Sequence, residues 1–344
     1  VDYINTSIGV ATASLYMIEA SMHIPPGYAM FIPSAIRKAV DLPVVGVGRF
    51  KDPLQAERAL AEGHCDLVGV VRGQIADPDF AAKARAGATD EIRLCLSCNQ
   101  ECVGRMGLNR WLGCIENPRT GREHEWAVDN HVALTAKPKD VMVVGGGPAG
   151  LQAAIAAARN GHRVTVYEKD DKVGGQVRLA ASVPNRAEFG DMIRNQINEC
   201  RRLGVEIVTG TGVWPGFVDE KKPDHVIVAT GAEPQRPWWV ADPDHDESAR
   251  RVVDVRAILD GSAPLGGPQS GESVVVVDEI GFHHATSVAE LLADRGCHVE
   301  ITTPGMVVGQ DLGITLDMEN WWIRAGAKGI VQSTDLVPMG FANG

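Results

Sequence analysis

The sequence lacks three features that would each define a class of protein. It has no excess of positive charge: 33 Lys and Arg face 44 Asp and Glu, for a formal net charge of −11. This balance argues against nucleic acid or an anionic membrane as the partner. It also has no uninterrupted apolar span, since the most apolar stretch, 141–158, contains the run Gly-Gly-Gly-Pro. We therefore expect neither a membrane-spanning segment nor a nucleic-acid site.

The third missing feature is a secreted disulfide framework. Four of the seven cysteines lie in one short stretch, and the other three, Cys65, Cys200 and Cys297, are isolated. Isolated cysteines of this kind are most often small buried side chains. No secretory leader opens the sequence, so we expect the chain to be cytoplasmic.

The cysteine-rich stretch, CLSCNQECVGRMGLNRWLGC, is the most informative part of the sequence. Its members, Cys95, Cys98, Cys102 and Cys114, follow the spacing C-x2-C-x3-C-x11-C. Zinc sites more often use two separated pairs, whereas three cysteines in one loop plus a distant fourth are typical of a [4Fe–4S] cluster. The spacing favours the cluster; structural zinc is the alternative, and disulfides are a third one.

Residues 1–91 alternate between strand and helix patterns. Strands are predicted over 3–9, 43–50 and 65–72, and helices over 32–40, 53–63 and 77–87. Alternation of this kind indicates parallel βαβ units, which are enough for the C-terminal part of a TIM-type (β/α)8 barrel. The dipeptides Asp52-Pro53 and Asp77-Pro78 are predicted to begin helices, with Asp as the N-cap.

The ends of two of these predicted strands carry an arginine. Gly48 and Arg49 end one strand, and Arg72 and Gly73 end the next. Phosphate sites in such barrels form from the loops after the last strands, where backbone N–H groups and an arginine meet an anion. The alternative is that both arginines are solvated loop charges.

From Asp140 the sequence carries a nucleotide-binding pattern. A strand, the turn GGGPAG, an alanine-rich helix and a second strand ending at Glu168 follow one another. Gly145 permits the tight turn, Gly147 lets the backbone approach a pyrophosphate, and Gly150 lets the helix pack on the strand. Glu168 can accept a hydrogen bond from a ribose hydroxyl. The sequences VGGQ (173–176) and VIVATGAEP (226–234) favour FAD, or at least an ADP moiety, over NAD.

A second unit of the same type spans 273–304, but its turn is different. Asp278 and Ile280 stand where a nucleotide loop requires glycine, and Gly281 is retained. A carboxylate at this position would repel a pyrophosphate. We expect the fold of this unit to be kept and NAD(P)H binding to be impaired. His283 and His284 are expected to be packing or surface residues.

The order of these motifs resembles the iron–sulfur flavoproteins of the old yellow enzyme family. That family includes 2,4-dienoyl-CoA reductase, trimethylamine and dimethylamine dehydrogenases and NADH:flavin oxidoreductases. The resemblance covers essentially the whole chain and is carried by INTSIG, GVGRF, VVRGQIADP, the cysteine stretch with CIENPRTG, GGGPAG, VYEK, VGGQ and ATG.

The resemblance implies a chain of three cofactors. FMN would have its phosphate at the strand ends, a [4Fe–4S] cluster would be held by the four clustered cysteines, and FAD or ADP would bind the glycine turn. The implied flavin-binding residues are Gly48, Arg49, Val70, Val71, Arg72, Gly145, Gly147, Pro148, Ala149, Gly150, Glu168 and Gln176.

The implied activity is hydride transfer between FMN and an organic substrate of the enoyl type, with electrons relayed through the cluster to FAD and NAD(P)H. One alternative is an amine dehydrogenase that passes electrons to an electron-transfer flavoprotein. Another is an electron-transfer module with no substrate chemistry of its own. No catalytic acid is visible, because Val10, Ala11 and Thr12 follow the SIG turn, where some reductases carry a histidine.

The predicted fold is therefore α/β, in four parts. We expect part of an FMN barrel over 1–91, the cluster loop and a connector over 92–138, a Rossmann-like FAD domain over 139–236, and an incomplete second Rossmann-like unit over 237–344. The family's barrel is about twice as long as the part found here. The chain is thus expected to be an internal fragment that holds FMN weakly.

Overall fold

The computed structural model of the chain describes residues 1–125, 135, 137–240, 251–263, 265 and 271–340. It divides into two compact units, which are considered separately below. Unit 1 comprises Val1–Arg178 and Glu188–Gly231, and unit 2 comprises Leu179–Ala187 and Ala232–Gly344. Residues 126–134, in the predicted connector, and residues 241–250 lie outside the described residues. Within the described residues, no helix has both the length and the apolar character needed to cross a membrane.

The first part of unit 1 is a three-stranded parallel sheet with short helices. Its strands are β1 (Ile4–Asn5), β2 (Val44–Gly46) and β3 (Leu67–Val68), in the order β1-β2-β3. The helices are α1 (Leu15–Ile18), α2 (Phe31–Arg37), α3 (Pro53–Ala61), α4 (Arg72–Ala76) and α5 (Phe80–Arg85). The parallel order confirms the predicted βαβ units, and α4 was not predicted.

Only the first of the two Asp-Pro dipeptides lies directly at the start of a helix. Asp52 is the N-cap of α3, with its carboxylate accepting the N–H of Leu54 at 2.8 Å, as predicted. Asp77 does not begin a helix; it follows α4, and α5 begins only at Phe80. Its buried carboxylate accepts the N–H of Asp79 at 3.0 Å, and it also accepts hydrogen bonds from Lys83 (2.6 Å) and from the N–H of Arg93 (2.9 Å). Asp77 thereby combines a local turn with a contact that holds the entry to the cysteine stretch.

The cysteine stretch has little regular structure. It is preceded by the short 3-10 helix η1 (Thr89–Glu91) and contains the short helix α6 (Val103–Gly107). Turn-type backbone hydrogen bonds within the segment and contacts to the preceding chain hold it in place. The N–H of Met22 donates to Ser97 O at 2.9 Å, and the Asn99 side chain donates to Glu19 O at 2.7 Å.

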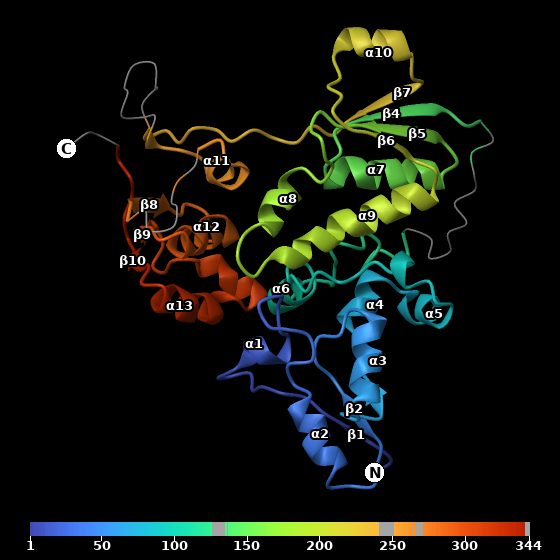
Figure 1. Cartoon of the computed structure of the whole chain (residues 1–344), viewed down its shortest axis with the longest axis vertical. Helices are drawn as coiled ribbons and strands as arrows, with labels where there is room; N and C mark the ends of the chain where they lie inside the picture. Colours follow the sequence, from blue (N-terminus) through green and yellow to red (C-terminus); the bar gives the residue numbers. More distant parts are fainter. Residues whose placement is uncertain (126–134, 136, 241–250, 264, 266–270, 341–344) are drawn as a thin grey trace. The chain divides into compact units, whose positions relative to one another are not determined.

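The second part of unit 1 is a four-stranded parallel sheet in the order β6-β5-β4-β7. The strands are β4 (Asp140–Val144), β5 (Arg163–Tyr167), β6 (Glu206–Val208) and β7 (His225–Val228). Its helices are α7 (Pro148–Arg159), α9 (Gly190–Arg202) and α10 (Pro215–Lys221). Helix α8 (Gln176–Ala181) begins in unit 1 and ends in unit 2, and the 3-10 turn η2 (Ala187–Phe189) returns the chain to unit 1 before α9. Helices α7 and α9 cover one face of the sheet (Figure 1), and their apolar sides form its core with β4 and β5.

Unit 2 is a smaller parallel sheet in the order β10-β9-β8. Its elements are α11 (Val255–Asp260), β8 (Ser273–Val277), α12 (His283–Asp294), β9 (His298–Thr302), the 3-10 helix η4 (Gln310–Thr315), α13 (Met318–Ala327) and β10 (Val331–Ser333). The core lies between the sheet and helices α12 and α13, around Ala289, Leu292, Ile301 and Trp321. The expected fold of this unit is confirmed.

A buried ion-pair cluster ties the two parts of unit 1 together. The Arg49 guanidinium, 2% exposed, makes two parallel bonds of 2.9 Å with the carboxylate of Glu188. Lys51 contacts Glu188 at 2.7 Å and Asp191 at 2.6 Å. Burial alone would raise the pKa of Glu188, but Arg49 and Lys51 outweigh it and leave that pKa below its ordinary value.

We predict that Glu188→Gln destabilises unit 1 by about 3 kcal/mol at neutral pH, because the Arg49 charge loses its buried partner. A carboxylate whose folded pKa is lowered stabilises the fold above its unfolded pKa of about 4.5, and this contribution is lost as pH falls through the folded pKa. The unfolding curves of wild type and variant should therefore converge below pH ~4. Urea unfolding at several pH values measures this, with the exposed Glu57→Gln as control; a pH-independent difference would contradict it.

Candidate functional site

The four clustered cysteines converge on one pocket. Cys95, Cys98, Cys102 and Cys114 all line it, although Cys114 is separated from Cys102 by eleven residues. The rest of the lining is Arg72, Ile75, Leu96, Ser97, Asn99, Ile115 and Glu116. All four thiols are free, as are those of the buried Cys65, Cys200 and Cys297, so the structure shows no disulfide at the cluster. The expectation that the three isolated cysteines are buried is confirmed.

The loop between the first cysteines is shaped by left-handed backbone. Ser97 and Asn99, which flank Cys98, have φ angles of 52° and 58°. Such angles are unfavourable for most residues but common for asparagine. Asn99 is fully buried, and its side chain accepts from Arg72 at 2.5 Å while donating to Glu19 O. These bonds hold the strained turn that directs the Cys98 thiol into the pocket.

The electrostatics of the pocket fit a bound metal centre. Burial raises the pKa of Cys98 and Cys102, and raises that of Cys114 to about 12. Backbone N–H groups that point at the sulfurs oppose this effect of burial. Ser97 N lies 3.3 Å from Cys95 Sγ, and the N–H groups of Gln100, Val103 and Asn117 donate to Cys98, Cys102 and Cys114, respectively. N–H donors around thiolate ligands are typical of iron–sulfur sites. The donor set of four sulfurs fits [4Fe–4S], and equally fits tetrahedral zinc.

Arg72 follows strand β3 and lines the cysteine pocket. It begins α4 just after β3, and its guanidinium donates to Asn99 and, at 2.7 Å, to Ala20 O. A guanidinium carries about five N–H donors, so these two bonds leave capacity for an anion. Its positive charge also lowers the pKa of the Cys102 thiol, against the larger effect of burial.

The remaining predicted phosphate residues lie at the carboxyl ends of β2 and β3. These strands are parallel neighbours, so Gly48 and Arg49 on one, and Val70 and Val71 on the other, come to the same edge. The Arg49 guanidinium is bound bidentately by Glu188. Its buried Nε–H has no hydrogen-bond partner among the described residues, so this group and the backbone N–H are the donors that Arg49 keeps for a phosphate.

The glycines of the turn have different structural roles. At Gly145, with φ of 105°, a Cβ would lie 2.3 Å from Ala229 O; at Gly150, it would lie 1.9 Å from Gly145 O. These two glycines are required by packing. At Gly147 a Cβ would meet no atom within 4 Å, so this side of the turn is open. Open space at the start of the twelve-residue helix α7 fits a pyrophosphate approaching the backbone.

The other predicted nucleotide residues gather at the same edge of the sheet. Pro148 and Ala149 form the first turn of α7. The buried carboxylate of Glu168 accepts the N–H of Gly146 at 2.7 Å and that of Asp170 at 3.0 Å, which fixes the turn against the end of β5. Gln176 follows the glycine pair 174–175, whose first N–H donates to Gly146 O at 2.8 Å. The VGGQ segment thus folds back over the turn.

Sequence reasoning missed a buried polar network between the cysteine segment and the nucleotide helices. Arg93 donates to Glu116 O at 2.6 Å and pairs with the buried Glu199 of α9, which also pairs with Arg159 of α7. Burial raises the pKa of Glu116 to about 7. The partners are far apart in the sequence, and nothing local signals their pairing.

Two family models match different parts of the chain. The model described as "NADH:flavin oxidoreductase / NADH oxidase family" matches residues 6–91. The model described as "Pyridine nucleotide-disulphide oxidoreductase" matches residues 139–304. The cysteine stretch lies between the two matched regions.

Curated relatives and a solved structure are similar to most of the chain. N,N-dimethylglycine/sarcosine dehydrogenase of Chromohalobacter salexigens is 35% identical over 94% of this chain and 46% of its own length. NADH oxidase of Thermoanaerobacter brockii is 39% identical over 69% of the chain and 36% of its own length. The structure of 6-hydroxypseudooxynicotine amine oxidase from Pseudomonas geniculata N1 superposes with a TM-score of 0.88 at 28% identity, covering 98% of this chain and 50% of that one. The chain thus spans about half the length of these proteins, or less.

We predict that Gly150→Ala and Gly147→Ala differ sharply in stability. The first places a methyl group 1.9 Å from a backbone oxygen and should cost about 3 kcal/mol or more, since neither backbone segment can yield freely. The second places it in open space and should cost less than about 1 kcal/mol. Thermal unfolding of both variants measures this contrast; equal losses would contradict the assigned roles.

Proposed function

Because the chain belongs to the old yellow enzyme-like family of flavin-dependent NADH:flavin oxidoreductases, we propose that it carries the electron-relay portion of an iron–sulfur flavoprotein. The whole protein would exchange hydride between FMN and a small organic substrate. The observation that carries the proposal is the convergence of four free thiols on one pocket of unit 1. That pocket lies beside the barrel strand ends, and Arg93 links its segment to the helices of the nucleotide turn.

The cysteine pocket would hold the cluster. Cys95, Cys98, Cys102 and Cys114 supply the four thiolates, and the N–H groups around them lower the energetic cost of the negative charge. When bound, a [4Fe–4S] cluster exchanges single electrons, whereas a flavin can exchange one or two. Arg72 adds a positive charge at the pocket wall. The apolar lining from Ile75, Leu96 and Ile115 keeps water away from the sulfurs.

The glycine turn would bind the ADP portion of FAD. The backbone at Gly147 and the first turn of α7, with Pro148 and Ala149, would face the pyrophosphate. Glu168 already accepts two N–H groups, but a carboxylate has about four acceptor positions and could also accept a ribose hydroxyl. Gln176 lies on the segment that folds back over the turn.

For FMN, the strand ends would contribute the phosphate contacts. Of the two arginines, Arg72 lies in the wall of the cysteine pocket and keeps donors for an anion, whereas Arg49 is paired with Glu188 and would act through its Nε–H or its backbone N–H. The second role of Arg49 is to bind Glu188 and so position this edge against α9. The described residues contain no group that we assign as a catalytic acid.

An amine dehydrogenase that passes electrons to an electron-transfer flavoprotein is the second candidate. Two matches that cover nearly the whole chain, the dimethylglycine/sarcosine dehydrogenase and the amine oxidase, act on amines by their names. NADH oxidase and an alkene reductase/demethylase among the relatives keep the reductase direction open. Substrate-dependent bleaching of flavin by an amine, without NAD(P)H, would favour the dehydrogenase.

We predict that anaerobically purified chain contains iron and acid-labile sulfide in equal amounts, about four of each per chain. Cys98→Ser should lose most of both, because the cluster loses one of its four ligands, while Cys65→Ser, a buried thiol outside the pocket, should keep them. Iron and sulfide assays with the visible absorption spectrum measure this. Zinc without sulfide would replace the cluster with a structural metal site and overturn the relay proposal.

We also predict that Gly147→Val weakens ADP binding by roughly tenfold or more, because the side chain fills the space in which the pyrophosphate meets the backbone. Gly212→Val is the matched control, since Gly212 is exposed and its Cβ would likewise contact nothing. Isothermal titration calorimetry with ADP measures both variants. Equal affinities in the two variants would remove the ADP assignment from this turn.

A further inference from the structure

The chain contains two strand–turn–helix units, and their turns differ in what faces the helix start. In unit 1 the turn between β4 and α7 is Gly145–Gly147, and its last residue faces open space. In unit 2 the turn between β8 and α12 is 278–282, and it begins with Asp278, which is 1% exposed. A buried carboxylate therefore takes the place of the first glycine.

The Asp278 carboxylate binds the backbone of its own turn. One oxygen accepts the N–H of Gly281 at 2.8 Å, and the other accepts the N–H of Gly309 at 3.4 Å. Backbone N–H groups of such a turn are the donors that bind a pyrophosphate in a nucleotide site. Here an internal anion already uses the N–H of Gly281 in the turn, together with that of Gly309 in the segment after β9.

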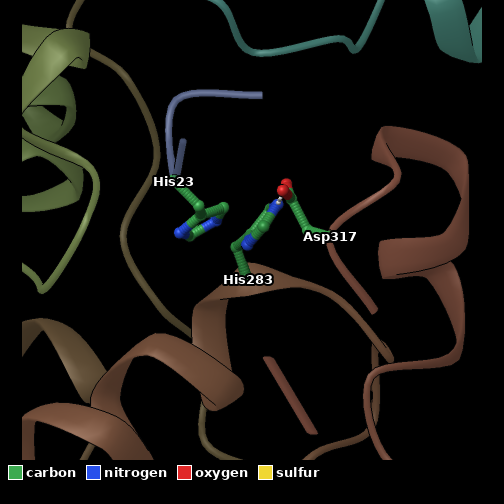
Figure 2. Close-up of side chains that lie close together, drawn as sticks. All are labelled: His23, His283 and Asp317. Atoms are coloured by element: carbon green, nitrogen blue, oxygen red, sulfur yellow. Dashed lines mark ion pairs between the residues drawn. The ribbon is translucent and has the colours of Figure 1, made fainter. Parts of the chain in front are cut away.

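The segment after β9 closes over the same turn. Asp311 N donates to Gly281 O at 2.9 Å, and Gly309, with φ of 68°, is packed so that a Cβ would lie 2.8 Å from Leu312 Cδ1. His283, the first residue of α12, is paired with the buried Asp317 at 3.3 Å (Figure 2). A second carboxylate thus lies at the start of α12, within unit 2.

The end of strand β9 carries no residue that is typical of a ribose site. Where β5 is followed by Glu168 in unit 1, β9 ends at Thr302 and is followed by the buried Thr303, whose N–H donates to Ser333 O at 3.1 Å. Neither a ribose-binding acid nor an arginine for a 2′-phosphate stands there. Glu279, in the turn itself, adds another exposed carboxylate.

We propose that Asp278 serves as a built-in substitute for the nucleotide phosphate, and that unit 2 consequently rejects NADH and NADPH. Asp278 is then a specificity-determining residue: it binds the N–H of its own turn and places a carboxylate where a pyrophosphate would meet that turn. The binding claim stands on unit 2 alone. The further consequence, that NAD(P)H bound at unit 2 does not supply electrons to the relay, rests on the proposed function.

Hydrogen–deuterium exchange of the full chain, with and without millimolar NADH or NADPH, tests the rejection. We expect exchange over 278–286 and 305–317 to be unchanged by either nucleotide. Saturable protection of these segments would overturn the proposal. ADP is added in a parallel experiment, in which protection over 145–150 reports on the nucleotide turn of unit 1. Absence of that protection would count against the proposed function, while the result for unit 2 would stand.

Asp278→Asn tests the role of the carboxylate. Asparagine has one acceptor oxygen in place of two, so at least one of the amides of Gly281 and Gly309 should exchange roughly tenfold faster. Asp294→Asn, at the far end of α12, is the control and should leave both amides unchanged. Unchanged exchange in a folded Asp278→Asn variant would overturn the proposal. If that variant does not fold, the nucleotide experiment on the wild-type chain still decides.

Discussion

Four thiols gathered in one pocket are the constraint on which unit 1 depends. Burial raises the pKa of the Cys98, Cys102 and Cys114 thiols, and only a cation or metal centre makes four thiolates tolerable there. The surrounding chain reduces that cost: N–H groups point at the sulfurs, and the Arg72 guanidinium lies in the pocket wall. The strained, left-handed turn at Ser97 and Asn99 is acceptable because buried hydrogen bonds hold it in place.

A pocket of this kind is useful for electron transfer only if both of its neighbours are held at fixed positions. Asp77 fastens the barrel helices to Arg93, and Arg93 in turn binds Glu199 of α9. On the other side, Arg49 binds Glu188, at the start of the same helix region. Helix α9 is therefore contacted from the barrel and from the cysteine segment. The electron relay proposed here would need such fixed spacing, and these buried ion pairs contribute to it.

The features that the sequence predicts well are those set by local geometry. The spacing of the cysteines and the glycines of GGGPAG each occupy one short segment, and the packing reasons for Gly145 and Gly150 follow directly from a tight strand–turn–helix. The features that the sequence could not predict depend on partners distant in the chain. Arg49 carries the residue type of a phosphate ligand, but its guanidinium is taken by Glu188, 139 residues away. Asp77 precedes proline as an N-cap would, but besides the local N–H of Asp79 its carboxylate binds the distant Arg93 N–H and the Lys83 ammonium.

The two nucleotide-type units show how one residue can change the use of a shared backbone pattern within a chain. Both units place a helix start at the carboxyl end of a strand, where unsatisfied N–H groups attract an anion. In unit 1 the anion must come from outside, because Gly147 leaves that space open. In unit 2 Asp278 supplies it from within, and the turn gains stability from the same donors that would otherwise bind a ligand. The fold of unit 2 can therefore persist, packed around Ile301 and Trp321, after its nucleotide site has been closed.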